Sequence, residues 1–233
     1  GLFDQEEFLD FVKRGANDRL LTRSINSTFS LDFFLFNFYP MYASIVAAIG
    51  RNTPFTTEIS REIGEAPLEL IAYVVKNNRP YSEILTADYT MVGHNTAKIF
   101  ENNTIPDPGT YLTGKDEGQL LSTDSSGIPS TNWENTVRAF AEPVGILSSL
   151  GYLQQYQTNA TNRNRARARW TLQHFLGIDI ENSAARNIDA SLLIDTNGGI
   201  TSRLACKVCH DRIDPVAGAF QRYGTRGLYL DGA

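Results

Sequence analysis

The feature that most constrains this 233-residue chain is a short run near its end, Cys206-Lys207-Val208-Cys209-His210. On a helix, the two thiols lie about one turn apart on one side, with the imidazole beside them. They are the only two cysteines in the chain. Two thiols at this spacing followed directly by His form the attachment sequence for a c-type haem, in which the thiols bind the vinyl groups and the His binds iron. The sequence therefore predicts one covalent haem c held by Cys206, Cys209 and His210.

Three other interpretations of this run stay open: a disulfide, a thiol redox pair and half of a zinc site. A disulfide or redox pair leaves the adjacent His210 unexplained. A structural zinc site usually has four Cys or His ligands, and the chain offers only two other His, His94 and His174, both far upstream. A redox pair is expected to open a helix after a strand, whereas this run follows a Gly-rich turn. Covalent haem accounts for more of the residues than any of these.

The composition of the chain limits the kinds of molecule that it can bind. The hydrophobic content of 42% is ample for a buried core. The formal net charge of −5 argues against general nucleic-acid binding, because phosphate contacts need a clustered surplus of cations. A basic or neutral redox partner protein, or a neighbouring haem domain, is compatible with this charge.

The most apolar stretch, residues 33–50, carries no charge over roughly the length of a membrane span. Asn37 and Pro40 interrupt its middle, and its aromatic first half differs from its Ala, Ile and Val second half. We therefore expect two buried helices that meet at Pro40, rather than a membrane span.

The rest of the pattern is mostly helical. Apolar residues at three- and four-residue spacing predict helices at 57–63 and at 67–77, with Pro67 at a first helical position. Further helices are expected at 133–153, with an interruption near Pro143, and at 162–176.

Between these helices, residues 102–131 are rich in Asn, Pro, Gly, Asp, Ser and Thr, which indicates a long loop or connection with a possible hairpin around Tyr111 and Leu120. The expected fold class is mainly α: a helical domain at 1–101, the connection at 102–131, and a c-type haem-binding domain at 132–233 that ends in a cytochrome c-like helical element.

Three segments also carry a resemblance to a known family. They are Pro80–Thr90, Asn162–Ile178 with its Arg-rich start, and Cys206–Gly224, which contains Cys-Lys-Val-Cys-His-Asp-Arg-Ile-Asp-Pro. Together they resemble the planctomycete-type cytochrome-associated domains of unknown function in bacterial secreted proteins, which end in a CxxCHxxIDP segment. The matches touch about half of the chain, and the last segment is the specific one. One departure is Met91-Val92-Gly93-His94, where the family pattern has Asn.

The resemblance implies a bacterial c-type cytochrome whose haem is attached outside the cytoplasmic membrane, so a periplasmic or extracellular location is expected. It also implies that the chain is one part of a larger chain or complex, because the family proteins are commonly larger. It assigns no reaction.

The second axial ligand of the iron can be narrowed by elimination. Only 23 residues follow His210, and they contain neither Met nor His. A distal Met or His would therefore come from upstream, and an empty position is also possible. We favour His94, then Met91, with His174, Met41, a Tyr or Lys, and no ligand as alternatives.

Arg165 and Arg169 are four residues apart on a predicted helix, and either can bind a haem propionate through paired N–H donors. The alternative is a solvated helix face. On the proximal side, Asp214 or a backbone carbonyl near it can accept the imidazole proton of His210. The preferred interpretation of Asp214 is a turn, directed by Pro215, that ends the haem helix.

Two functions follow from these residues. The first is an electron-transfer module in which a six-coordinate haem passes single electrons between partners. The alternative is a peroxidase-like haem enzyme with an open distal site, or a haem subunit of a larger multidomain enzyme or surface assembly. No paired distal acid and base stands out in the sequence, which favours electron transfer and leaves any enzymatic role uncertain.

Overall fold

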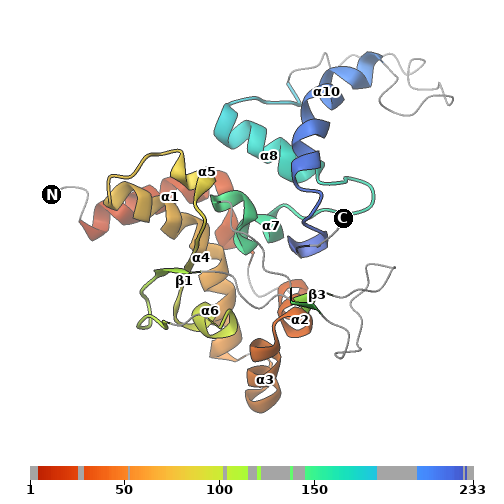
Figure 1. Cartoon of the computed structure of the whole chain (residues 1–233). Coiled ribbons are helices and arrows are strands. Elements are labelled where there is room, and N and C mark those ends of the chain that lie inside the picture. Colours follow the sequence, from red (N-terminus) through yellow and green to blue (C-terminus); the bar gives the residue numbers. More distant parts are fainter. Residues whose placement is uncertain are drawn as a thin grey trace. The chain divides into compact units, whose positions relative to one another are not determined.

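Figure 1 shows the fold of the chain in a computed structural model, which describes residues 5–25, 29–51, 53–101, 104–114, 120–121, 137–138, 145–182, 204–227 and 229. The described residues are mainly helical, with only short antiparallel strands beside the helices. The predicted mainly α fold class is therefore confirmed.

The chain divides into two compact units. The N-terminal unit comprises Gly1–Gln155 with Arg226–Gly232, and the C-terminal unit comprises Tyr156–Thr225 with Ala233. The predicted connection at 102–131 falls within the range of the N-terminal unit, and the division comes later, at Gln155.

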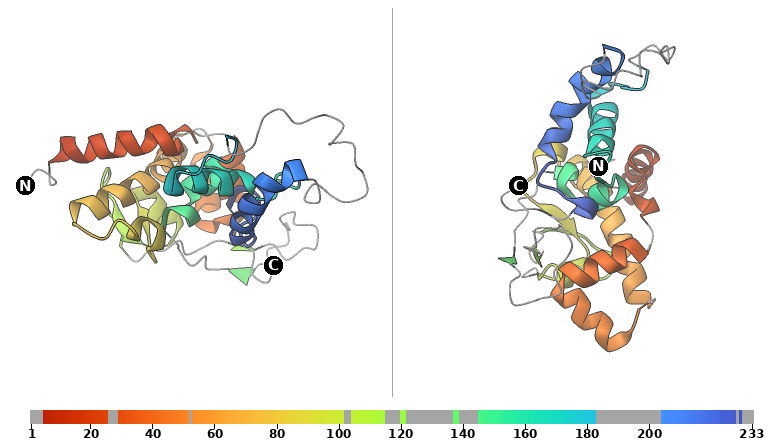
Figure 2. Two further views of the ribbon diagram at one scale, coloured as in Figure 1. Left: turned by 90° about the horizontal axis from the view of Figure 1, so that it is seen from above. Right: turned by 90° about the vertical axis from the view of Figure 1, so that its right-hand side faces the viewer.

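The N-terminal unit is built around one long helix, α4, against which α1 and α7 pack (Figures 1 and 2). Its α-helices are α1 (Glu6–Leu20), α2 (Phe29–Phe38), α3 (Pro40–Ile49), α4 (Pro54–Lys76), α5 (Glu83–Thr86), α6 (His94–Ile99) and α7 (Leu150–Gln155). Its 3-10 turns are η2 (Thr22–Ser24) and η4 (Gly145–Ser148), and η6 (Thr225–Gly227) begins at the last residue of the C-terminal unit's main range.

The apolar stretch at 33–50 forms the end of α2 and all of α3, as predicted from Pro40. Pro40 opens α3, where its missing N–H costs no helical hydrogen bond. Phe34, Tyr39 and Tyr42 are buried in the main core, which explains the aromatic content of the stretch. None of the helices in the described ranges combines the length and the apolar character that a membrane crossing needs.

The two helices predicted at 57–63 and 67–77 are one helix, α4, with Pro67 in its interior. Proline at this position removes the hydrogen bond to the carbonyl of Ile63, four residues earlier. Gly151 of α7 lies against this gap: a Cβ on it would come within 2.6 Å of the Ile63 oxygen and 2.9 Å of the Pro67 ring. The close approach of α7 therefore covers the interruption, and only glycine fits there.

Four short strands complete the N-terminal unit: β1 (Thr90–Val92), β2 (Leu112–Gly114), β3 (Leu120–Leu121) and β4 (Val137–Arg138). β2 pairs with β1 and β3 pairs with β4, both antiparallel, with Met91 opposite Thr113 and Leu121 opposite Val137. The segments after Tyr111 and at Leu120 are thus extended but pair with different partners, not with each other as predicted. The prediction of a helix at 133–153 is wrong at Val137–Arg138, which form β4. The other residues between 133 and 144 lie outside the described ranges.

The C-terminal unit contains α8 (Arg165–Leu176) and α10 (Leu204–Ala219), which lie side by side in Figures 1 and 2. Their contact is a small apolar core that includes Ala168 and Leu172 of α8 and Ile213 and Ala217 of α10. The predicted helix at 162–176 and the predicted helical state of the Cys206 run are therefore present. Pro215 does not end α10, which continues to Ala219.

Candidate functional site

Helix α10 carries the residues predicted to attach haem. Cys206 and Cys209 are both partly buried, and both thiols are free of disulfides. His210 follows on the same helix with its side chain 17% exposed. Cys206, His210 and Asp214 follow one another at four-residue spacing, so they line one side of α10.

His210 makes a hydrogen bond that fixes its ring. Its Nδ1 lies 3.0 Å from Oδ2 of Asp214. Because an ionised carboxylate only accepts hydrogen bonds, Nδ1 is the donor and carries the proton. This leaves Nε2 as the ring nitrogen available to a metal, which is the arrangement found at metal-binding His residues.

Asp214 is held in turn by Arg165 of α8. Arg165 Nε donates to Oδ1 at 2.7 Å, and Nη2 donates to Oδ2 at 3.3 Å. The hydrogen bond from Arg165 holds the pKa of Asp214 below its usual value; partial burial opposes this shift and the bond from His210 supports it. Asp214 is therefore an ionised acceptor at neutral pH, and the interpretation as a turn that ends the helix is corrected.

The second arginine predicted to bind a propionate also binds a carboxylate of the chain. Arg169 Nη1 lies 2.7 Å from Oε1 of Glu181, and its guanidinium stacks 4.7 Å from the centre of the Trp170 ring. Arg165 and Arg169 thus have protein partners in this structure, and a propionate would share or replace them.

A third arginine of the same run, Arg167, is completely buried. Its guanidinium donates to the carbonyl oxygens of Tyr156, Tyr223 and Gly224 at 2.7–3.0 Å and to Oδ1 of Asn164 at 2.9 Å. It therefore ties the loop before α8 and the segment after α10 to α8 itself. The alternating Arg pattern gave no sign of this, because sequence alone did not show which face of α8 is covered.

Cys209 lies at the contact between the two helices. It packs against the α8–α10 core, and its Sγ is 3.6 Å from the carbonyl oxygen of Ile180. Val208, on the neighbouring position, is 48% exposed. The run therefore has one side turned to the core of the unit and one to solvent.

His94 stands at the first position of α6 in the N-terminal unit, and both of its ring nitrogens have partners. Nδ1 is 2.8 Å from the carbonyl oxygen of Pro106 and so donates to it, while Nε2 is 2.7 Å from Nζ of Lys98 and accepts from it. To bind iron through Nε2, His94 would have to release Lys98.

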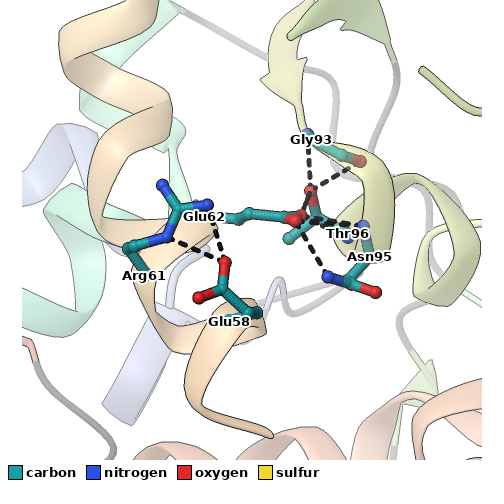
Figure 3. A network of polar contacts seen from close by, with 6 residues as sticks. All are labelled: Glu58, Arg61, Glu62, Gly93, Asn95 and Thr96. Atoms are coloured by element: carbon teal, nitrogen blue, oxygen red, sulfur yellow. Dashed lines mark hydrogen bonds and ion pairs between the residues drawn. The ribbon is translucent and has the colours of Figure 1, made fainter. Parts of the chain in front are cut away.

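Glu62 of α4 fixes the turn that carries His94 (Figure 3). This carboxylate is 2% exposed and accepts from the backbone N–H groups of Asn95 and Thr96 at 2.7–3.1 Å. Gly93, before the helix, has no side chain to cap α6, so Glu62 supplies the oxygen atoms from α4. A Cβ on Gly93 would come within 2.6 Å of this carboxyl group. The role of Glu62 is thus to anchor α6.

The other two candidate ligands lie in different units. Met91 is buried in β1 and lines a small pocket of the N-terminal unit together with Ile63, Thr96 and Phe100. His174 lies on α8, in the same unit as His210. Its ring stacks on Trp170 at 5.0 Å, and its Nε2 is 3.3 Å from the hydroxyl of Tyr156.

Neither a metal-holding cluster in the described ranges nor a similarity to a known protein adds to these observations. Within the described ranges, no group of three or more His, Cys, Asp or Glu side chains is arranged to hold a metal ion. Comparison of the chain with family models, curated proteins and solved structures found no match.

The residues of α10 nevertheless fit the chemistry of haem attachment. Two unpaired thiols at CxxC spacing lie on a helix, and the next residue is a His whose Nδ1 is already hydrogen-bonded. A thioether needs a free thiol, and axial ligation needs a neutral imidazole with one open nitrogen. Cys206 and Cys209 supply the free thiols, and Nε2 of His210 is the ring nitrogen that the bond to Asp214 leaves open.

Proposed function

We propose that this protein is a c-type cytochrome that binds one haem covalently through Cys206 and Cys209, with His210 as the proximal iron ligand, and serves as an electron-transfer module. The observation that carries the proposal is the arrangement on α10: two free thiols and a His oriented by Asp214. The resemblance of Cys206–Gly224 to bacterial secreted haem proteins supports the same assignment.

When bound, the haem would supply a one-electron redox couple. The chain's own residues would fix its place and surroundings: the thiols hold it on α10, and His210 is held with Nε2 open by Asp214. We expect a redox partner protein or a neighbouring haem domain to exchange electrons with it. Because such haem attachment takes place outside the bacterial cytoplasm, we propose a periplasmic or extracellular location.

The distal ligand separates this function from the alternative, a peroxidase-like enzyme or a haem subunit of a larger assembly. His94, Met91 and His174 remain the proposed candidates. Each has partners or packing that ligation would replace, most completely at His94, where both ring nitrogens are bonded. A sixth ligand would favour electron transfer, and an open position would favour chemistry on small ligands.

The first test is to produce the full chain with a bacterial haem-maturation system and measure covalent haem by the pyridine haemochrome assay after denaturation. We expect one haem per chain, complete loss in the C206S/C209S double variant, and full loading in K207A, which changes only the residue between the thiols and its exposed partner bond to Asp211. Absence of covalent haem in the unmodified chain would overturn the proposal.

Optical and electron paramagnetic resonance spectra of the loaded protein then choose between the two functions. A low-spin haem that ignores added cyanide supports electron transfer. A high-spin haem that binds cyanide and reacts with peroxide would replace electron transfer by the enzyme alternative. H94A, M91A and H174A identify the ligand by the variant whose low-spin spectrum is lost.

A further inference from the structure

The contacts of Asp214 link two helices to one imidazole. Oδ1 of Asp214 receives the short bond from Arg165 Nε, at 2.7 Å, while Oδ2 faces His210 Nδ1 at 3.0 Å. Arg165 comes from α8, and the other two residues come from α10. The carboxylate is therefore held from outside its own helix, with one oxygen atom directed at the His ring.

This arrangement has a chemical consequence for any metal on Nε2. A carboxylate that accepts the N–H bond of a ligating imidazole raises the basicity of the ligand and fixes its orientation. A more strongly donating ligand stabilises the oxidised metal more than the reduced metal, which lowers the reduction potential. The negative charge of Asp214 acts in the same direction.

Arg165 weakens the effect of Asp214 on the His210 ligand, and it also fixes the orientation of the Asp214 carboxylate. Its positive charge competes for the electrons of the carboxylate, so it weakens the pull of Asp214 on the His210 proton. Its two-atom contact also keeps the carboxylate plane in place, because guanidinium and carboxylate groups pair in a fixed geometry. Asp214 thus orients and strengthens the His210 ligand, and Arg165 holds Asp214 in place while it limits that strengthening.

We propose that Asp214 and Arg165 are positioning residues of the proximal His, and that Asp214 lowers the reduction potential of the haem while Arg165 limits that lowering. This inference rests on the proposed haem attachment and goes beyond it, because it states how the chain sets the potential of the site.

The same helix supplies a control for a purely structural or purely electrostatic role. Asp211 lies next to His210 and pairs with Lys207 at 2.6 Å, at the same four-residue spacing as the His210–Asp214 pair. Its side chain is 57% exposed, and its hydrogen bonds go to Lys207. D211N therefore removes the same charge from α10 as D214N without altering the bond to the imidazole.

The experiment measures haem loading by the pyridine haemochrome assay and then the midpoint potential by spectroelectrochemistry, for the unmodified protein, D214N, D211N and R165Q. We expect D214N to raise the equilibrium constant for reduction about tenfold, which corresponds to about 59 mV for one electron. D211N should change that constant by less than about threefold, in keeping with a screened exposed charge. R165Q should lower it.

The outcomes separate the two proposals. No covalent haem in the unmodified protein overturns the proposed function, and this inference with it. Loaded haem with equal shifts in D214N and D211N, or no shift in D214N, overturns only the role of Asp214. If D214N loads no haem, R165Q decides: a lower potential supports the inference, and a higher or unchanged potential overturns it.

Discussion

Glu62 of the N-terminal unit and Asp214 of the C-terminal unit are both carboxylates that accept several hydrogen bonds, yet their surroundings differ. Glu62 is 2% exposed and accepts from the backbone N–H groups that open α6 as well as from the side chains of Asn95 and Thr96, whereas the side chain of Asp214 is 31% exposed and binds the side chains of Arg165 and His210. A carboxylate that satisfies backbone donors in the interior fixes the fold. One that is shared by an imidazole and a guanidinium at a partly open position fixes a side chain with metal-binding chemistry.

The C-terminal unit divides these two tasks between neighbouring arginines. Arg167 is completely buried and bonds three backbone carbonyl groups, so it does for this unit what Glu62 does for the N-terminal unit. Arg165, two residues earlier, pairs with Asp214. Substitutions at the buried groups should therefore damage stability, and substitutions at the Asp214 pair should change the site while the fold persists.

The largest effect is expected for R167M, which keeps an unbranched apolar stem but removes the guanidinium and its bonds to the carbonyl oxygens of Tyr156, Tyr223 and Gly224. Because these acceptors lie in the interior, we expect the free energy of unfolding of the C-terminal unit to fall by about 4 kcal/mol. Urea unfolding followed by the fluorescence of Trp170, in a W133F background, measures it. The control is R163M, an exposed Arg beside the same helix. A loss below about 1 kcal/mol in R167M would show that Arg167 does not fix the fold of the C-terminal unit as Glu62 fixes α6.

The counterpart in the N-terminal unit is E62Q. The amide keeps the shape of Glu62 but turns an NH₂ group toward the N–H donors of Asn95 and Thr96, so we expect a loss of about 2–3 kcal/mol. Hydrogen exchange of the α6 amides measures the local opening. E58Q is the matched control, because Glu58 lies on the same helix with its side chain 46% exposed and pairs with the side chain of Arg61 (Figure 3). Equal effects of the two variants would contradict the anchoring role of Glu62.

A steric test of the same anchor is G93A. A Cβ on Gly93 would lie 2.6 Å from the carboxyl carbon of Glu62 and 2.7 Å from its Oε2, which cannot retreat without losing its bonds to α6, so a loss of about 1–3 kcal/mol is expected. G15A is the control, since Gly15 is an exposed position inside α1 with no atom within 4 Å of the added Cβ. That variant should gain up to about 1 kcal/mol. A stable G93A with normal α6 exchange would show that the turn can adjust.

A smaller stability effect is expected for D214N. The pair with Arg165 is partly exposed, so its loss should cost less than about 1 kcal/mol in the Trp170 unfolding assay. A loss of unfolding free energy in D214N that is smaller than the loss in E62Q would support the difference between Asp214 and Glu62. A cost as large as that of E62Q would mean that Asp214 is a fold-fixing residue like Glu62, and that its contact with His210 is secondary.

Sequence patterns predicted the elements whose signals are local. The break at Pro40 marks the end of one helix and the start of another, because the proline opens α3. Pro67 and Pro215 carry the same local signal but lie inside helices. The gap at Pro67 is covered by Gly151, which is 84 residues away in sequence, and the carbonyl of Asp211 before Pro215 lies on an exposed part of α10 where water can bond it.

In the candidate site, too, the sequence predicts the residues whose signal is local and not the contacts made by distant residues. The thiols and His210 form a motif that is complete within five residues, so the sequence suffices to propose them. The sequence allows Asp214 as an acceptor but favours a turn before Pro215, and the four-residue spacing from His210 on a helix is the signal that indicates the contact. The burial of Arg167 and the partners of Arg165 depend on which faces of α8 and α10 meet, and a run of alternating Arg residues does not contain that information.

The smallest predicted effect, at pH 10, concerns Tyr156, which packs against Trp170 and His174 in the C-terminal unit. Burial raises the pKa of Tyr156 to about 12, above its value of about 10 in an unfolded chain. A group that holds its proton more tightly when folded contributes stability below the unfolded pKa and loses it as pH rises through the folded pKa. Stability of this unit should therefore fall by about 0.4 kcal/mol at pH 10 and continue to fall toward pH 12.

Trp170-monitored unfolding of W133F and of W133F/Y156F at pH 8, 10 and 11 isolates this contribution, since only the chain with Tyr156 has it. Parallel pH profiles for the two proteins would show that Tyr156 ionises as easily in the folded unit as in the unfolded chain, and that its burial does not contribute to the stability of the C-terminal unit in this way.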